Sequence, residues 1–462
     1  MHNPKEDISD TIIPMRHNKI DMVNGPLLKN IFIFSLPLMA TNLLQMLFNA
    51  VDTIVVGKFA GELPLAAVGA TGSIIYLWTS LFQGLAVGTN VLVARYLGAK
   101  NDEGASKACY SAITMGLFCG VAMSIAGVFV ARPILLLMDT PADILDLSTT
   151  YLRIYLFGSF SLITYNFASG ILRAKGDTKR PMNYLIVAGI VNAILNVIFV
   201  VFFKLSVLGV AVATVISSTL SMLLIMRALL SETDCTRIEL DKLHIDKDSV
   251  KEILRIGVPS GIQGMAFSFT NMIVQSAINS FDSSTIVAGN TAAINIENFI
   301  YIGMMAFSSA AITFTSQSLG AGRKERILKI MFITMLLDCG SALLIGSLAY
   351  RFGGTLLLLY TDEAPVVAIG MKRLFWIGMF LALNGMLDIL GNSMCGMGHS
   401  TLPAVIMLSG IIVTRMLWLK FVFPVYNTID VIYMCFPISW LVTTLIDMVA
   451  YFFVYRKVVL YN

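Results

Sequence analysis

The chain has 462 residues, of which 57% are hydrophobic and only 13% are charged, and its formal net charge is +4. Because soluble domains carry about 25% charged residues, this composition excludes an ordinary soluble protein and predicts an integral membrane protein. The apolar runs are continuous over about 20 residues, as membrane-spanning helices require, whereas strands of a membrane barrel alternate over about 10 residues. We therefore expect an all-α integral membrane protein, and the small net charge gives no reason to expect a nucleic-acid partner.

Hydropathy divides the chain into twelve apolar spans, each long enough to cross a bilayer. In chain order they cover residues 29–56, 65–93, 108–131, 150–171, 183–203, 207–229, 253–279, 286–317, 330–350, 366–394, 402–422 and 432–455. The six cysteines are scattered without a Cys-x-x-Cys pair, and the four histidines fall in predicted loops. The sequence also lacks the phosphate-binding loop of ATP-driven pumps and the His-Glu-x-x-His motif of metalloproteases. We therefore expect no metal site, no cofactor and no enzymatic activity.

The first span carries a polar stripe in an otherwise apolar helix. Asn42, Gln45, Asn49 and Asp52 recur at intervals of three, four and three residues, which places all four on one helix face. A charge inside the membrane costs about 2.5–3.5 kcal/mol on insertion scales, so such residues usually line a cavity and serve a function. Asp52 is therefore our first candidate for binding a coupling ion. The alternative is that Asp52 lies near the helix end, reaches the outer headgroups and has no special role.

Three asparagines in later spans extend this candidate ion site. Asn192 and Asn196 lie one helical turn apart in the fifth span, and Asn166 lies in the fourth. Removal from water disfavours the charged form of a carboxyl, so Asp52 among Asn49 and these amides is expected to carry a proton. Taken singly, each asparagine is better explained by hydrogen bonding between helices, which contributes about 0.6–2 kcal/mol.

The sequence repeats itself at an offset of 222 residues. The matched segments are residues 35–37 with 257–259, 97–99 with 319–321, and 176–181 with 398–403. Because each repeat holds six spans, the two halves keep the same orientation, which is the parallel-repeat plan of secondary transporters with a central site between halves. We therefore expect 12 transmembrane helices in two six-helix lobes. A duplication kept only for packing, as in a channel, is the alternative.

The basic residues set the expected orientation. Most of the Lys and Arg residues fall on one side of the twelve-span scheme, the side that also holds both termini. Such a bias marks the cytoplasmic side, so we expect both termini in the cytoplasm of a bacterial cell, with the chain in its cytoplasmic membrane. The expected parts are an N-terminal segment at 1–28, a first lobe at 29–230, a linker at 231–250 and a second lobe at 251–457. The charged linker is predicted to be a solvated connector.

The second lobe has no counterpart of Asp52, because Val274 stands at the matching position. We therefore expect the ion site in the first lobe and a polar substrate site that both lobes line. The candidate substrate-binding residues are Gln45, Asn271, Gln275, Glu297, Asn384 and Asp388. Acids in a cleft attract cations, which favours Glu297 and Asp388 as sites for cationic ligands. The alternative for these two is a structural ion pair with Arg415 or Lys420. For two further acids a structural role is favoured, namely Asp338 and Asp447.

Three motifs carry a family resemblance: VDTIVVGKFAG at residues 51–61, ARYLGAKN at 94–101 and ILRAKGDTKRPM at 171–182. Together with the repeat, they resemble the multidrug and toxic compound extrusion (MATE) family, in particular its MepA/DinF-like bacterial branch. The resemblance implies export of organic cations and drugs in exchange for protons or sodium. It also implies that Asp52 is the family's first-helix aspartate. Asn166 and the pair Asn192 and Asn196 match its fourth- and fifth-helix polar residues, although the pair has Asn in place of the usual Asp.

A second departure concerns the coupling ion. Sodium-coupled members carry a Glu on the seventh helix and an Asp on the tenth, where this chain has Phe267 or Ser268 and Asn384. The resemblance therefore implies a multidrug antiporter coupled to protons, with sodium as the alternative, working as a monomer among membrane lipids. Other interpretations are a lipid-linked precursor flippase, which would want a basic central cavity where acids prevail here, and a channel, which would conduct passively. An intramembrane enzyme would need a nucleophile and base that the sequence does not offer.

Overall fold

The computed structural model describes residues 20–460, and all regular structure in that range is helical. Residues 1–19 and 461–462 lie outside the described residues, and they include most of the N-terminal segment expected at 1–28.

Within the described residues, the first half of the chain forms seven α-helices. They are α1 (Leu27–Phe59), α2 (Glu62–Gly98), α3 (Asp102–Leu137), α4 (Ala142–Phe157), α5 (Ser159–Ala174), α6 (Lys179–Asn196) and α7 (Ser206–Leu230). A π-helical segment, Val197–Phe202, extends α6, and a single 3₁₀ turn, Leu240–Lys242, lies between the halves.

The second half forms nine α-helices, several of them joined by π-helical segments. They are α8 (Lys247–Asn279), α9 (Ser284–Gly320), α10 (Lys324–Arg351), α11 (Gly353–Leu357), α12 (Ala364–Arg373), α13 (Leu381–Gly396), α14 (Thr401–Leu417), α15 (Phe423–Tyr426) and α16 (Ile429–Tyr455). The π-helical segments are Leu374–Gly378 before α13, Trp418–Val422 after α14, and Arg456–Leu460 after α16.

Every one of the twelve predicted spans coincides with a helical segment, so the all-α membrane fold is confirmed. Ten of the described segments are long and apolar enough to cross a membrane. The fourth predicted span is broken at Gly158 into α4 and α5, and α8 carries many polar residues. A Cβ at Gly158 would lie 2.4 Å from a methyl carbon of Val215, so glycine lets α7 approach at the break.

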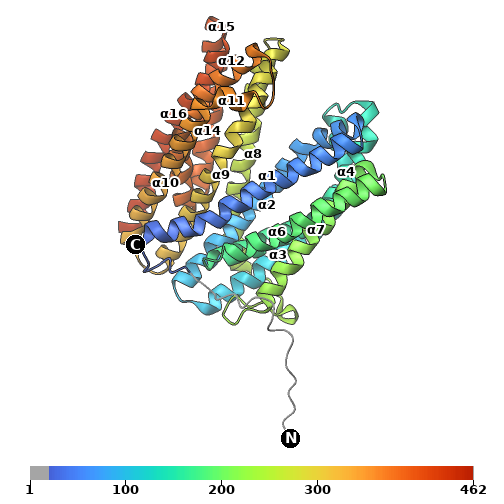
Figure 1. Ribbon diagram of the computed structural model, residues 1–462. Coiled ribbons are helices and arrows are strands. Elements are labelled where there is room, and N and C mark those ends of the chain that lie inside the picture. The colour runs from blue at the N-terminus through green and yellow to red at the C-terminus, as the bar shows by residue number, and fades with distance from the viewer. Residues whose placement is uncertain (1–19, 461–462) are drawn as a thin grey trace.

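The helices form two lobes that lie side by side, α1–α7 and α8–α16 (Figure 1). We call the end of the bundle where α2 and α9 end, and where residues 231–246 lie, the linker end, and the opposite end the far end. The described chain begins and finishes at the linker end, where Met22 and Val458 belong to one apolar cluster. Figure 1 shows the lobes converging at the linker end and diverging toward the far end.

The first helix of each lobe crosses between the lobes. The beginning of α1 packs on the second lobe, where the rings of Phe34 and Phe314 are 5.5 Å apart, whereas Val55 and Val56 belong to a first-lobe cluster. In α8, Ile253 packs into the first lobe and Ile278 into the second. Each of the two helices contains a proline, Pro37 in α1 and Pro259 in α8, at matching repeat positions.

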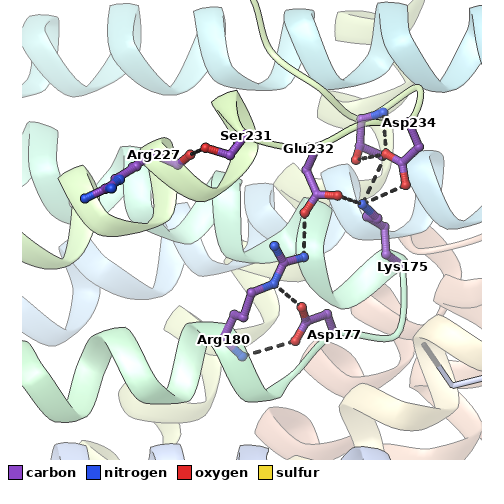
Figure 2. A network of polar contacts seen from close by, with 8 residues as sticks. Lys175, Asp177, Arg180, Arg227, Ser231, Glu232 and Asp234 are labelled. Carbon is purple, nitrogen blue, oxygen red and sulfur yellow. Dashed lines mark hydrogen bonds and ion pairs between the residues drawn. The ribbon is translucent and has the colours of Figure 1, made fainter. Parts of the chain in front are cut away.

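The linker is packed against the first lobe and is not the solvated connector that its charge suggested. Ile238 is 1% exposed within an apolar cluster, and the Asp246 N–H donates to the Ser111 hydroxyl at 2.9 Å. Figure 2 shows Glu232 between two cations, with the Lys175 ammonium 2.5 Å from one carboxylate oxygen and the Arg180 guanidinium 2.5 Å from the other. Two acids of the linker, Glu232 and Asp234, therefore pair with cations at the end of α5 and the beginning of α6.

Candidate functional site

Asp52 lies in a hydrogen-bonded cluster that joins α1, α6 and α7. The Asn196 side-chain amide donates to the Asp52 carboxyl, and the same NH₂ group donates to the Asn192 carbonyl oxygen at 3.1 Å. Asn192 in turn donates to the Thr214 hydroxyl at 3.5 Å. Asn196 is fully buried and Asn192 nearly so, whereas Asp52 is half-buried. The structure thus brings together three of the five predicted coupling-ion residues.

This cluster suits a carboxyl that changes its protonation state, because its partner is a neutral amide. The NH₂ group of Asn196 can donate a hydrogen bond to a charged Asp52 carboxylate. If the amide rotated, its carbonyl oxygen could accept a hydrogen bond from a protonated Asp52. Within the described residues, that carbonyl oxygen is buried and has no hydrogen-bond partner. Carboxylate and amide oxygens are also suitable ligands for a hard cation such as sodium.

The other two predicted coupling-ion residues lie outside the cluster. Asn166 of α5 donates to the carbonyl oxygen of Leu162 at 2.9 Å, one turn back in its own helix. Asn49 is exposed, as is Gln45 one turn earlier. Because α1 still contacts the second lobe at Met39, these two polar residues follow the point where α1 leaves that lobe. Gln45 and Asn49 therefore lie on the part of α1 that follows its contact with the second lobe.

In the second lobe, Glu297 forms a buried ion pair with Arg373 at 2.8 Å. The guanidinium also donates to the Asn290 carbonyl oxygen at 2.8 Å and lies over the Phe436 ring. Gln275 accepts from the Asn290 amide at 2.9 Å, which adds a predicted substrate residue to the same network. This geometry favours the structural alternative for Glu297, but the partner is Arg373 and not Arg415 or Lys420.

Asn271 is engaged by Arg415, whose side chain is fully buried. The guanidinium donates to the Asn271 carbonyl oxygen at 3.3 Å and to the Ser439 hydroxyl at 3.1 Å, and it lies 4.2 Å from the centre of the Phe436 ring. None of the ion pairs found among the described residues includes Arg415, and one of its terminal nitrogens is buried there without a hydrogen-bond partner. Amide, hydroxyl and aromatic groups therefore stabilise this cation.

The remaining two substrate candidates lie together on α13, where the Asn384 amide donates to Asp388 at 3.2 Å. Asp338 of α10 and Asp447 of α16 each lie within electrostatic range of Asp388, so three acids gather inside the second lobe. Both oxygens of Asp338 are buried without a hydrogen-bond partner among the described residues. No group of three or more metal-ligating side chains in residues 20–460 has the geometry to hold a metal ion.

Two residues at these sites escaped the sequence analysis. Thr214 is one of two threonines in α7, which also carries several serines, and nothing in its pattern separates it from an ordinary buried hydroxyl. Arg373 did carry a signal, because a cation within an apolar span requires a partner. The acid it pairs with is 76 residues away, so only the fold identifies it.

Comparison with known proteins places this geometry in context. A sequence model of the MatE family matches residues 37–198 and 259–418, one match in each lobe. The chain is 28% identical over 451 residues to the probable multidrug resistance protein YoeA of Bacillus subtilis, covering 93% of this chain and 94% of YoeA. It is 26% identical over 372 residues to the probable multidrug resistance protein YpnP of the same organism, covering 80% and 83% of the two chains.

Among solved structures, a MOP superfamily transporter from Pyrococcus furiosus has the same fold, with a TM-score of 0.89 at 22% sequence identity. The match covers 96% of this chain and 98% of that chain, whose binding pocket is described as having reverse polarity. These matches confirm the family resemblance that the motifs indicated.

Proposed function

Because the chain belongs to the MatE family of multidrug transporters, we propose that it exports small organic cations from a bacterial cell in exchange for a coupling cation. The coupling cation of this proposal is the proton, with sodium as the alternative. Membership of the family supports transport of small molecules. The exchange of substrate for a cation, the identity of that cation and the residue that binds it are our proposal.

The observation that carries the proposal is the contact between Asp52 and Asn196. Glu297 is paired with a permanent cation, Arg373, which compensates its negative charge in the folded protein. Asp52 has a neutral amide as partner and is half-buried, so it can take up a proton without leaving an uncompensated cation. It also joins three helices of one lobe, so a change in its charge would act directly on the packing of α1 against α6 and α7.

In this proposal, proton and substrate prefer different conformations of the transporter. Protonation of Asp52 from the outside favours release of substrate outward, and loss of the proton to the cytoplasm favours rebinding of substrate there. Coupling then follows from the differential affinity of the two conformations for the two ligands. Exchange of one proton for one monovalent cation moves no net charge, so the pH gradient alone would drive it.

Ethidium efflux from membrane vesicles tests this proposal. Vesicles with wild-type protein or Asp52→Asn receive either a pH gradient or a sodium gradient, and ethidium fluorescence reports export. We expect wild-type efflux to follow the pH gradient and the variant to lose at least about tenfold in initial rate, the size expected when a coupling ion no longer shifts the conformational equilibrium. Efflux that follows sodium would transfer the assignment to that ion. Unchanged efflux by Asp52→Asn against the substrate gradient would refute the role of Asp52.

A further inference from the structure

The loop that follows α5, at residues 175–178, has its counterions within the protein. Glu232 of the linker contacts the Lys175 ammonium and the Arg180 guanidinium, each at 2.5 Å. Asp234 places a second carboxylate 2.9 Å from the same ammonium. Asp177 places a third carboxylate beside the same guanidinium (Figure 2). The first lobe therefore compensates the positive charge at this loop with its own acids.

The internal repeat places residues 397–400, the loop that follows α13, at the corresponding position of the second lobe. Gly176 and Gly398 share a backbone φ of +87°, so the two loops turn in the same way. The three acids do not recur in the second lobe. Their matches at the 222-residue offset are Asp177 with His399, Glu232 with Val454, and Asp234 with Arg456. Two carboxyl side chains are thus replaced by basic ones and the third by an apolar one.

Arg95 of α2 lies against this second loop. A Cβ at Gly398 would lie 2.4 Å from one terminal nitrogen of the Arg95 guanidinium. That nitrogen and Nε are buried, and within the described residues neither has a hydrogen-bond partner. The side chain as a whole is half-buried. Because arginine stays charged in proteins, a guanidinium in this setting is stabilised by any anion that can reach it.

Two further cations approach the same loop. The Ser400 hydroxyl donates to the carbonyl oxygen of Arg255 in α8 at 3.1 Å, which holds that residue beside the loop. Met397 and Val458 belong to one apolar cluster, which brings the neighbouring Lys457 to the loop. Arg255 and Lys457 are both exposed. The loop thus gathers cations from α2, α8 and the π-helical segment after α16.

The charges around this loop do not balance. Burial lowers the pKa of the His399 ring, and the three cations lower it further, so all three lie within electrostatic range of the ring. The acid that acts on Arg95 is Glu252, which already pairs with Arg255 at 3.2 Å. Among the described residues, this one carboxylate accompanies three cations. The excess positive charge favours an anion from outside the chain.

The surface beside the loop is apolar and aromatic. Phe452 and Phe453 of α16, about one turn before Lys457, are 53% and 64% exposed. Arg456 lies over the Phe452 ring, and Leu254 of α8 is exposed as well. Aromatic side chains and cations gather where membrane-spanning helices meet the lipid headgroups. A phospholipid matches both features, since its acyl chains contact apolar surface and its phosphate contacts cations.

We propose that Arg95, Arg255 and Lys457 bind the headgroup phosphate of an anionic phospholipid beside the loop at residues 397–400. The lipid phosphate supplies the negative charge that the protein's own acids supply in the first lobe. Guanidinium groups suit this role, because their N–H groups match phosphate oxygens in pairs. The inference does not rest on the proposed function, since a headgroup site requires neither a transported substrate nor a coupling ion.

Native mass spectrometry of the full chain in detergent tests the site. It counts bound lipids while phosphatidylglycerol, the anionic probe, or phosphatidylcholine, its zwitterionic counterpart, is titrated. The test variant is Arg95→Gln with Lys457→Gln, because glutamine stands at the repeat position of Arg95, as Gln317. The charge-matched control is Lys107→Gln with Lys242→Gln, which removes two exposed cations that pair with acids of their own.

We expect the wild-type protein to retain phosphatidylglycerol in preference to phosphatidylcholine. The test variant should bind the first phosphatidylglycerol at least about tenfold more weakly, and the control should bind it as the wild type does. Equal affinity in the test variant, or equal weakening in the control, would overturn the proposal. Displacement of phosphatidylglycerol by inorganic phosphate would overturn the assignment to a lipid. If the test variant fails to fold, the exposed Lys457→Gln alone is compared with Lys107→Gln.

A further variant supplies the missing counterion. His399→Asp places a carboxyl where the first lobe has Asp177, in the loop that Arg95 contacts. It should weaken phosphatidylglycerol binding at least about tenfold, whereas the neutral His399→Gln should bind as the wild type does. Phosphatidylglycerol should also raise the thermal unfolding midpoint of the wild type and leave that of His399→Asp unchanged. Wild-type affinity in His399→Asp would contradict the proposal.

Discussion

At the residue scale, the partner of each buried acid decides what that acid can do. Asp52 is held by Asn196, an uncharged group that can donate or accept, whereas Glu297 is held by Arg373, a permanent cation. The polar stripe on α1 selected Asp52 as a candidate from spacing alone. Spacing does not show that Asp52 and Glu297 differ in chemical role. That difference depends on their partners, Asn196 and Arg373, which come from helices distant in sequence.

This contrast predicts that Asn196 is required for coupling. Asn196→Ala removes the donor to Asp52, so the acid loses the group that responds to its protonation state, and export driven by a pH gradient should fall at least about tenfold. Asn166→Ala is the matched control, because within residues 20–460 its amide donates to the carbonyl oxygen of Leu162 in its own helix. Vesicle efflux measures both variants. Equal losses in the two would show that any asparagine inside the lobe matters and that Asn196 has no special role.

At the element scale, each of the twelve spans that hydropathy predicts coincides with a helical segment, and ten described segments are long and apolar enough to cross a membrane. Hydropathy could not predict the break at Gly158, since an isolated glycine in an apolar run gives no direct sign that α7 approaches there. Hydropathy also could not predict that the linker packs against the first lobe. The residues 231–246 are rich in charge, and only the fold supplies the opposite charges at Lys175 and Arg180 that draw the linker onto the first lobe (Figure 2).

The docked linker predicts a stability effect of one substitution. Glu232→Ala removes the carboxylate that Lys175 and Arg180 both contact. Because Asp234 and Asp177 still pair with these two cations, the loss of unfolding free energy should be smaller than the roughly 3–5 kcal/mol of a buried pair broken outright. Glu239→Ala, in the same linker, removes a pair with Lys242 whose groups are exposed, and should leave the unfolding midpoint unchanged. Thermal unfolding in detergent micelles compares the two. No effect of Glu232→Ala would mean that the linker is held by apolar contacts such as those of Ile238.

The loop between α13 and α14 predicts a pH dependence of the linker end. Burial lowers the pKa of the His399 imidazole below its usual 6.5, and the neighbouring cations Lys457, Arg255 and Arg95 act in the same direction. The folded protein thus prefers the neutral ring, so stability is complete above pH 6.5 and declines as the pH falls below it. Because the ring is partly exposed, we expect a loss below about 1 kcal/mol.

Thermal unfolding midpoints measured from pH 7.5 to 5 check this sign. His399→Gln should flatten the part of the decline that begins near pH 6.5. A wild-type midpoint that rises on acidification would contradict the assignment, since it would require a folded state that prefers the charged ring.

At the scale of the whole molecule, the distribution of basic residues and the shape of the lobes give one orientation. Most Lys and Arg residues fall in segments that the twelve-span scheme puts on the linker side, and the positive-inside bias predicts that this side faces the cytoplasm. The lobes would then diverge toward the outside (Figure 1). We predict that a membrane-impermeant maleimide labels Asp143→Cys and Asp362→Cys at the far end in intact cells. Asp241→Cys in the linker should react only in inverted vesicles; all three positions are exposed. Labelling of Asp241→Cys in intact cells would reverse the predicted orientation.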